Sequence, residues 1–128
     1  MIVVDTNVVA YFFIDGDRTE AARRLWEQEP AWALPPLWRH EFLNVLATYC
    51  RAGGMDAGDV LALWHQADAI MAPCEQAVDL AAALSLAIET GISAYDAQFV
   101  CLAHSLETRL ITEDKQLLRL FAGSTTPL

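Results

Sequence analysis

Basic residues are scarce in this sequence. Eight Lys and Arg stand against 17 Asp and Glu, which gives a formal net charge of −9 at pH 7. Because affinity for phosphates comes mostly from Lys and Arg, so acidic a protein is not expected to bind nucleic acid non-specifically. A role on nucleic acid would therefore have to depend on bridging metal ions, on a local basic patch or on a partner.

Long apolar runs are missing as well. No run reaches the roughly 18 residues that a membrane-spanning helix needs. The first residues already show the pattern of a buried strand, which is not the pattern of a signal peptide. We therefore expect a cytoplasmic protein with no membrane attachment.

Cysteines are few and poorly placed for chemistry. Cys50, Cys74 and Cys101 are odd in number and far apart. Neither a disulfide framework nor a paired-cysteine metal or redox site is therefore expected. Free cysteine behaves as a small apolar side chain and is often buried, and this is the role we expect for all three.

The remaining composition favours one compact unit. With 128 residues and 55% hydrophobic side chains, the chain can build one sizeable core and has no room for a second. It contains no repeats, no low-complexity stretch and no linker. We expect a single domain over residues 1–128.

Short apolar strands alternate with helices along the chain. Strands are expected at 2–4, 32–34 and 110–112, with a possible edge strand at 125–126. Helical periodicity predicts helices over 7–13, 17–29, 37–52, 56–71, 78–90, 94–106 and 116–121. The second of these opens with the capping-box spacing of Asp17 and Glu20. This alternation predicts a helix-rich α/β fold with a parallel sheet, in which ligands gather beyond the carboxyl ends of the strands.

Two acids come directly after apolar strands. Asp5 follows Ile2-Val3-Val4, and Asp114 follows Leu110-Ile111-Thr112 by two residues. Each would lie at the sheet edge where α/β sites form. Each is also well placed to be the N-cap of the next helix, which is the alternative interpretation.

Two further acids lie on or beside the apolar stripes of helices. Glu41 comes three residues after Trp38 and four before Val45, and Asp96 comes four residues before Val100. A carboxylate that faces a core costs several kcal/mol unless it is paired or binds a metal. No basic residue repeats on the same face of either helix. The alternative is a carboxylate tilted to the boundary of its stripe.

The four acids could converge on one cleft. Four neighbouring carboxylates would repel one another and would not stay ionised together without a cation. With no Cys or His in the set, the ligands would all be oxygens, which favours Mg²⁺ or Mn²⁺ over Zn²⁺. Such a site can activate water for phosphodiester hydrolysis.

The same residues resemble those of the PIN-domain family, especially the VapC-type toxins of prokaryotic toxin–antitoxin pairs. The N-terminal Ile2-Val3-Val4-Asp5-Thr6-Asn7 is similar to the opening of PIN domains, and Glu41 matches the acid of the family's third helix. Ser93-Ala94-Tyr95-Asp96-Ala97 resembles the third acidic motif, and Leu110-Ile111-Thr112-Glu113-Asp114 resembles the fourth. The likeness covers nearly the whole chain, with all four motifs in order.

This resemblance implies a three-layer α/β/α sandwich with a central parallel sheet and an endoribonuclease that depends on Mg²⁺ or Mn²⁺. It implies a homodimer and a cognate antitoxin that blocks the site. Asp5, Asp96 and Asp114 would be metal ligands, and Glu41 would ligate directly or through water. The polar groups behind the ligands or facing the phosphate would be Thr6, Asn7 and Thr112. Two departures are an extra acid, Glu113, and a poorly defined middle strand near 72–76.

Other residues are less informative. Arg39, Lys115 and Arg119 are the basic residues nearest the motifs and are candidates for phosphate contact, with plain solvated charge as the alternative. The four tryptophans are expected in the core. A positive mean hydropathy of +0.27 in so small a protein suggests a covered apolar surface, and we expect the helical hairpin over 37–71 or the first two helices to meet a partner.

Competing functions differ in what they require. A receiver-like domain would need two adjacent acids after the first strand, where Asp5 is followed by Thr6. A phosphatase of the haloacid-dehalogenase type would need a second Asp where Asn7 stands. Neither explains Glu41 and Asp96. A non-catalytic binding module and a PIN-fold RNA-processing nuclease outside a toxin pair stay open as alternatives.

Overall fold

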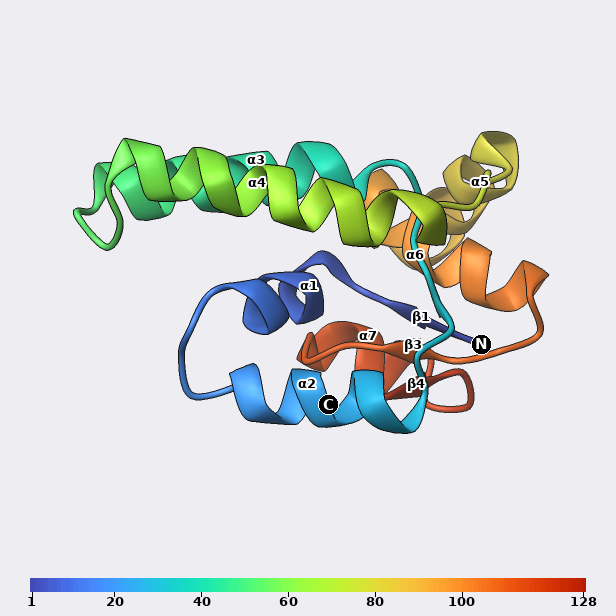
Figure 1. The fold of residues 1–128 in the computed structure, drawn as a ribbon. Coiled ribbons are helices and arrows are strands. Elements are labelled where there is room, and N and C mark those ends of the chain that lie inside the picture. Colours follow the sequence, from blue (N-terminus) through green and yellow to red (C-terminus); the bar gives the residue numbers. More distant parts are fainter.

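The strands form one four-stranded sheet, which lies between helices (Figure 1). In the computed structural model, which describes residues 1–128, the strands are β1 (Ile2–Val4), β2 (Trp32–Ala33), β3 (Leu110–Ile111) and β4 (Thr125–Thr126). Their order is β2-β1-β3-β4 and every pairing is parallel. All four expected strands are therefore confirmed, including the edge strand, with two of them one residue shorter than expected.

Seven α-helices and one short 3₁₀ helix surround the sheet. They are α1 (Thr6–Phe13), α2 (Thr19–Gln28), α3 (Trp38–Arg51), α4 (Ala57–Met71), η1 (Ala72–Cys74), α5 (Leu80–Thr90), α6 (Ala94–Ser105) and α7 (Lys115–Leu120). None of them combines the length and apolarity that a membrane-spanning segment requires. The helices expected from periodicity are all present, with ends that differ by one or two residues.

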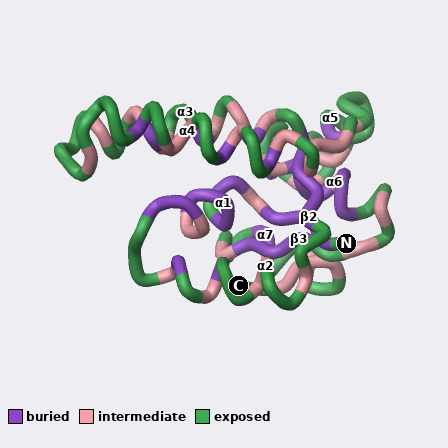
Figure 2. The backbone as a smooth tube through the Cα atoms, in the orientation of Figure 1, coloured by how far each residue is buried: buried purple, intermediate pink, exposed green.

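The sheet separates two apolar clusters because successive strand residues face opposite sides. Ile2 and Val4 join one cluster together with α1, α2, α3 and α4. Val3 and Leu110 join the other, with α5, α6 and α7. Figure 2 shows the buried backbone running through the strands and α1, between outer helices that are exposed on one side. The architecture is a helix-rich three-layer α/β/α sandwich, as expected.

Side-chain caps fix most helix starts. Asp5, Asp56, Asp79, Ser93 and Asp114 each accept a hydrogen bond from the backbone three residues later. The expected capping box of α2 is wrong, because its N-cap is Arg18 and makes no side-chain cap. Instead, the buried hydroxyl of Thr19 accepts from Gly16 N (3.0 Å) and donates to Ile14 O (2.9 Å). A buried hydroxyl needs partners, and here the preceding turn supplies them.

The helices α3 and α4 form a long hairpin across one side of the molecule (Figure 1). Its turn contains Gly53, whose φ of +78° suits glycine. Arg39 ties the hairpin together, since its guanidinium binds the carboxylates of Asp68 and Glu75 and lies over the rings of Trp38 and Trp64. Arg39 is therefore not available for phosphate contact, and that interpretation of the sequence is wrong.

Two smaller expectations need correction. The segment near 72–76 forms η1 and a single bridge between Leu34 and Glu75 in place of a middle strand. Pro73, which has no N–H to donate, lies within this segment. The cysteines are unpaired but only partly buried, because each lies at the boundary of a cluster.

Candidate functional site

A cleft of about 270 Å³ opens beside the carboxyl ends of β1 and β3. This is the sheet edge where ligands bind in doubly wound folds. All four acids singled out in the sequence line it, although they come from four separate segments. The lining residues are Asp5, Thr6, Asn7, Glu41, Asn44, Val45, Asp96, Asp114 and Leu117.

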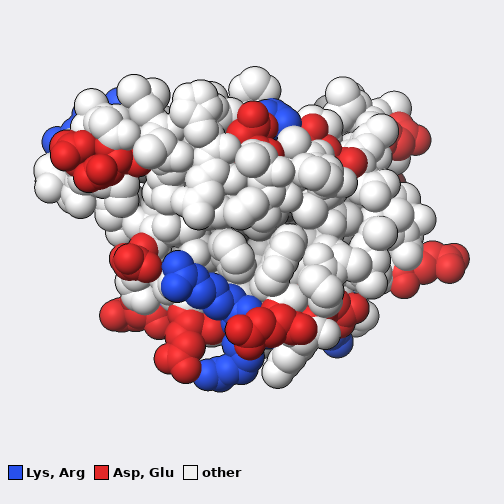
Figure 3. All heavy atoms as spheres, in the orientation of Figure 1, with Lys and Arg blue, Asp and Glu red and all other residues white.

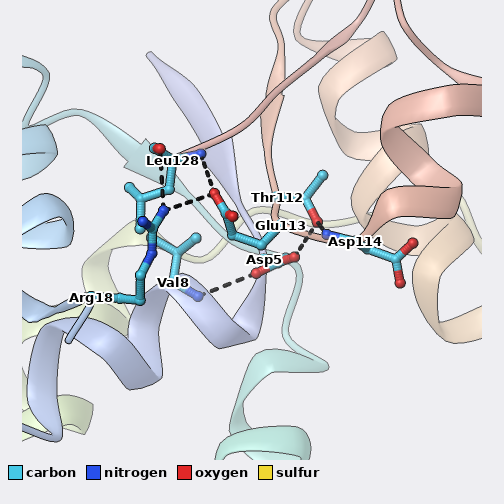
Figure 4. A network of polar contacts seen from close by, with 7 residues as sticks. All are labelled: Asp5, Val8, Arg18, Thr112, Glu113, Asp114 and Leu128. Atoms are coloured by element: carbon cyan, nitrogen blue, oxygen red, sulfur yellow. Dashed lines mark hydrogen bonds and ion pairs between the residues drawn. The ribbon is translucent and has the colours of Figure 1, made fainter. Parts of the chain in front are cut away.

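Asp5 lines the cleft and also caps a helix, so both roles considered for it in the sequence are present. As the N-cap of α1, its Oδ1 accepts from Val8 N at 3.2 Å. Its Oδ2 accepts from the hydroxyl of Thr112 at the end of β3, so the two strands are joined by a side-chain contact (Figure 4). Burial raises the pKa of Asp5 from 3.8 to about 6, against the lowering effect of these hydrogen bonds, and the charge of Asp96 adds to the increase.

Glu41 enters the cleft from the first turn of α3. It is half-buried, and its Oε1 accepts a 2.7 Å hydrogen bond from the hydroxyl of Thr6 in α1. Burial raises its pKa first and repulsion from Asp96 second, while the bond from Thr6 lowers it. Glu41 thus lies at the boundary of its apolar stripe with its carboxylate held toward the cleft.

Asp96 and Asp114 complete the acidic lining. Asp96 belongs to the first turn of α6, where burial, followed by repulsion from Asp114, raises its pKa. Asp114 caps α7 through Leu117 N at 3.0 Å. Asp96 is the carboxylate that interacts electrostatically with all three of the others, because its charge also raises the pKa of Asp5 and of Glu41.

Polar side chains hold these acids in place. Thr112 is fully buried; its hydroxyl donates to Asp5 and accepts from Asp114 N at 3.1 Å. Thr6 is nearly buried behind Glu41, and Asn7 is exposed on the rim. Asn44 also lines the cleft, three residues after Glu41 on α3. Asn44 was not predicted from the sequence. The signal that could have identified it is its spacing of three residues from Glu41 on the same helix.

Glu113 lies outside the cleft although it adjoins Asp114. Its Oε1 pairs with Arg18 Nη2 at 3.0 Å and accepts from the backbone N–H of Leu128 at 2.7 Å. Figure 4 shows the side chains of Glu113 and Asp114 pointing to different sides of the chain. Glu113 therefore joins the C-terminal Leu128 to the N-cap residue of α2, and it is not a fifth acid of the cleft.

The cleft has a strongly negative lining. No Lys, Arg or His is among its lining residues, and on the face seen in Figure 3 the basic side chains are interspersed with acidic ones. Nowhere do three or more His, Cys, Asp or Glu side chains stand in a metal-holding arrangement. The donor set nevertheless suits a hard divalent cation, because it offers only oxygens and no protein cation competes for them.

Known proteins resemble the chain in sequence and in fold. The family model described as PIN domain matches residues 2–122. The chain is 31% identical to Ribonuclease VapC3 of Pyrobaculum aerophilum, over 98% of each chain. The crystal structure of PAE2754 from Pyrobaculum aerophilum has a TM-score of 0.77, with 21% identity over 97% of this chain and 81% of that one.

A second solved structure, described as a toxin-antitoxin complex from Klebsiella pneumoniae, has a TM-score of 0.61 with 18% identity, over 98% of this chain and 96% of that one. At identities this low, the two solved structures show only that the fold is shared. The family model and the 31% identical relative show that the chain and the family are related by descent. The resemblance found in the sequence is confirmed, and the chain belongs to the PIN-domain family.

Proposed function

We propose that the protein is a metal-dependent endoribonuclease that hydrolyses RNA phosphodiester bonds. The observation that carries the proposal is the convergence of Asp5, Glu41, Asp96 and Asp114 on one cleft that no basic side chain lines. Membership of the PIN-domain family and the likeness to a protein named as a ribonuclease support it.

Mg²⁺ or Mn²⁺ is the cofactor we propose, held by these four carboxylates. When bound, the ion supplies an activated water and stabilises the charge that develops on the phosphate. The raised pKa of Asp5, about 6, means that burial opposes its charge, and a cation beside it would favour the ionised form.

The surrounding residues would position the ligands and the substrate. Thr112 and Thr6 orient Asp5 and Glu41 through their hydroxyl groups. Hydrogen bonds of this kind fix the direction of metal-binding carboxylates. Glu41 is the acid we assign to orienting the attacking water, and the exposed amide of Asn7 is placed to contact a phosphate oxygen.

We further propose that the protein is the toxin of a toxin–antitoxin pair and acts in the cytoplasm. Its likeness to a protein named VapC3 and to a toxin-antitoxin complex supports this. A cognate antitoxin would inhibit it by inserting an Arg or Lys side chain among the carboxylates. A complex with no basic side chain near Asp5 and Asp96 would contradict that mode of inhibition.

A homodimer is also proposed, because apolar side chains stay exposed on the α3–α4 hairpin. Leu43 and Leu61 are 45% and 63% exposed and line an entirely apolar groove with Trp64. Apolar surface of this kind is usually covered in solution. Light scattering of the isolated protein at micromolar concentration should give twice the chain mass, and a stable monomer would contradict the proposal.

The nuclease proposal is tested with purified protein on structured and unstructured RNA, with Mg²⁺, with Mn²⁺ and with EDTA. We expect cleavage that requires metal and falls by at least about 100-fold in Asp96→Asn. Glu113→Gln is the matched control, since it neutralises the neighbouring acid outside the cleft and should keep most of the activity. Metal binding without cleavage of any RNA would contradict the nuclease function, as would equal cleavage by wild type and Asp96→Asn.

A further inference from the structure

A second groove continues from the acidic cleft. Its volume is about 280 Å³, and it shares the side chains of Asn7 and Val45 with the cleft. Its other lining residues come from α1, from the turn before α2 and from the end of α3; they are Ala10, Tyr11, Ile14, Gly16, Asp17, Arg18, Thr19 and Tyr49.

On both α1 and α3, residues spaced four apart lead from the acidic cleft into this groove. Residues four apart on a helix lie on the same face. On α3 this face carries Glu41, Val45 and Tyr49, which spans about 12 Å from the acidic cleft to the far end of the groove. On α1 the same spacing leads from Asn7 to Tyr11. The helices α1 and α3 are in contact, and residues of both faces line the cleft and the groove, so the two hollows adjoin.

Both tyrosines line the groove, but they differ in exposure, and Tyr11 also packs against the core. Tyr49 is 41% exposed, and Tyr11 is partly buried. A Cβ atom at Gly54 would lie 2.8 Å from Cδ1 of Tyr49. Any side chain at position 54 would therefore have to displace the ring of Tyr49.

The charges of the groove do not favour a phosphate. Its one basic residue, Arg18, is already paired with Glu113 at 3.0 Å and donates to Leu128 O at 3.2 Å. Asp17 adds a negative charge. The rest of the groove lining consists of aromatic rings, aliphatic side chains and neutral polar groups. Such a lining suits an uncharged planar group.

We propose that this groove holds one unpaired base of the RNA, next to the phosphate that enters the acidic cleft, with Tyr11 and Tyr49 as its stacking partners. The inference rests on the proposed nuclease function. Bases stack on aromatic side chains only where the strand is single or the base is unstacked. Tyr11 and Tyr49 would thus set the position of the base beside the cut.

The test measures binding of a fluorescein-labelled RNA of eight nucleotides with a non-repeating sequence, with Ca²⁺ in place of Mg²⁺ or Mn²⁺ as the bridging cation. A denaturing gel checks that the strand stays intact. We expect Tyr49→Leu and Tyr11→Leu each to weaken binding about tenfold. The matched controls Tyr49→Phe and Tyr11→Phe keep the ring and should bind as the wild type does. Circular dichroism of each variant checks that it is folded.

An abasic scan of the same strand tests the groove on the unmodified protein. Wild type should lose about tenfold in affinity when the base at one particular position is removed, and Tyr49→Leu should not respond to that removal. The duplex with the complementary strand should bind more weakly than the single strand. A flat scan, or Leu variants that bind like wild type, would overturn the inference and leave the groove to a protein partner.

These outcomes are separate from those of the nuclease proposal. Metal-dependent cleavage with a flat scan would keep the nuclease function and reject the stacking groove. Tyrosine-dependent binding of an RNA that is never cut would keep the groove and reject the nuclease function.

Discussion

Asp5 shows how one side chain can cap a helix and still be held in an unfavourable charge state. Its hydrogen bonds from Val8 N and Thr112 favour the carboxylate, yet burial outweighs them and its pKa rises from 3.8 to about 6. The folded protein consequently binds a proton at Asp5 more tightly than the unfolded chain does. The stability that this proton contributes is complete below about pH 4 and is lost as the pH rises through 6.

We therefore predict that Asp5→Asn, which stays uncharged, is more stable than wild type at pH 7.5 in EDTA. The difference in unfolding free energy should approach about 3 kcal/mol and disappear near pH 4. Urea unfolding at several pH values measures it. Glu27→Gln, a solvent-exposed acid, is the control and should show no such difference. A destabilised Asp5→Asn at pH 7.5 would mean that its hydrogen bonds matter more than its burial.

The acids of the cleft could be predicted from the sequence because each one departs from the apolar pattern of its helix or strand. Glu41 and Asp96 interrupt apolar helix faces, and Asp5 and Asp114 end apolar strands. Asn44 and the tyrosines of the groove break no such pattern, since Asn and Tyr are ordinary on a partly exposed helix. Their part in the cleft and groove depends on the approach of α1 to α3, which is a tertiary contact that local spacing does not reveal.

Helices and strands were predictable where their signals are local. Caps such as Ser93 and Asp114 mark helix starts within three residues. The start of α2 was not predictable in detail, because the hydroxyl of Thr19 is buried in the preceding turn and serves that turn. The ion pairs of Arg39 could not be predicted from local spacing either, because Asp68 and Glu75 lie 29 and 36 residues further along the chain.

We predict that Arg39→Ala lowers the free energy of unfolding by about 2 kcal/mol. Removing the guanidinium leaves two partly buried carboxylates without their partner and takes a cation from the faces of Trp38 and Trp64. The control is Arg24→Ala, which breaks an exposed pair with Glu20 and should cost at most about 0.5 kcal/mol. Equal effects of the two variants, measured by urea unfolding, would contradict the role given to Arg39 in joining α3 to α4.

The negative charge of the whole molecule would limit its electrostatic affinity for RNA. Four of the eight basic residues form ion pairs with acids of the same chain, two of them on the exposed surface; the four are Arg18, Arg23, Arg24 and Arg39. With a net charge of −9, the protein has little positive surface for releasing counterions from a phosphate backbone.

RNA binding should consequently depend weakly on salt. We predict that raising KCl from about 50 to 200 mM weakens binding of the eight-nucleotide RNA in the presence of Ca²⁺ by less than about threefold, whereas a protein with six to ten phosphate contacts loses about 10³- to 10⁵-fold. Fluorescence anisotropy measures the affinity. A loss of more than about a hundredfold would reveal a phosphate-binding patch and contradict this account.

Four acids from separate segments are proposed to form one site for a divalent cation, and calorimetric titration of Mn²⁺ tests this site most directly. Wild type and Glu113→Gln should bind Mn²⁺ alike, because Glu113 pairs with Arg18 outside the cleft. Asp96→Asn, which removes the carboxylate that interacts with the other three, should bind at least about tenfold more weakly. Equal affinities in all three proteins, or no binding by wild type, would contradict the claim.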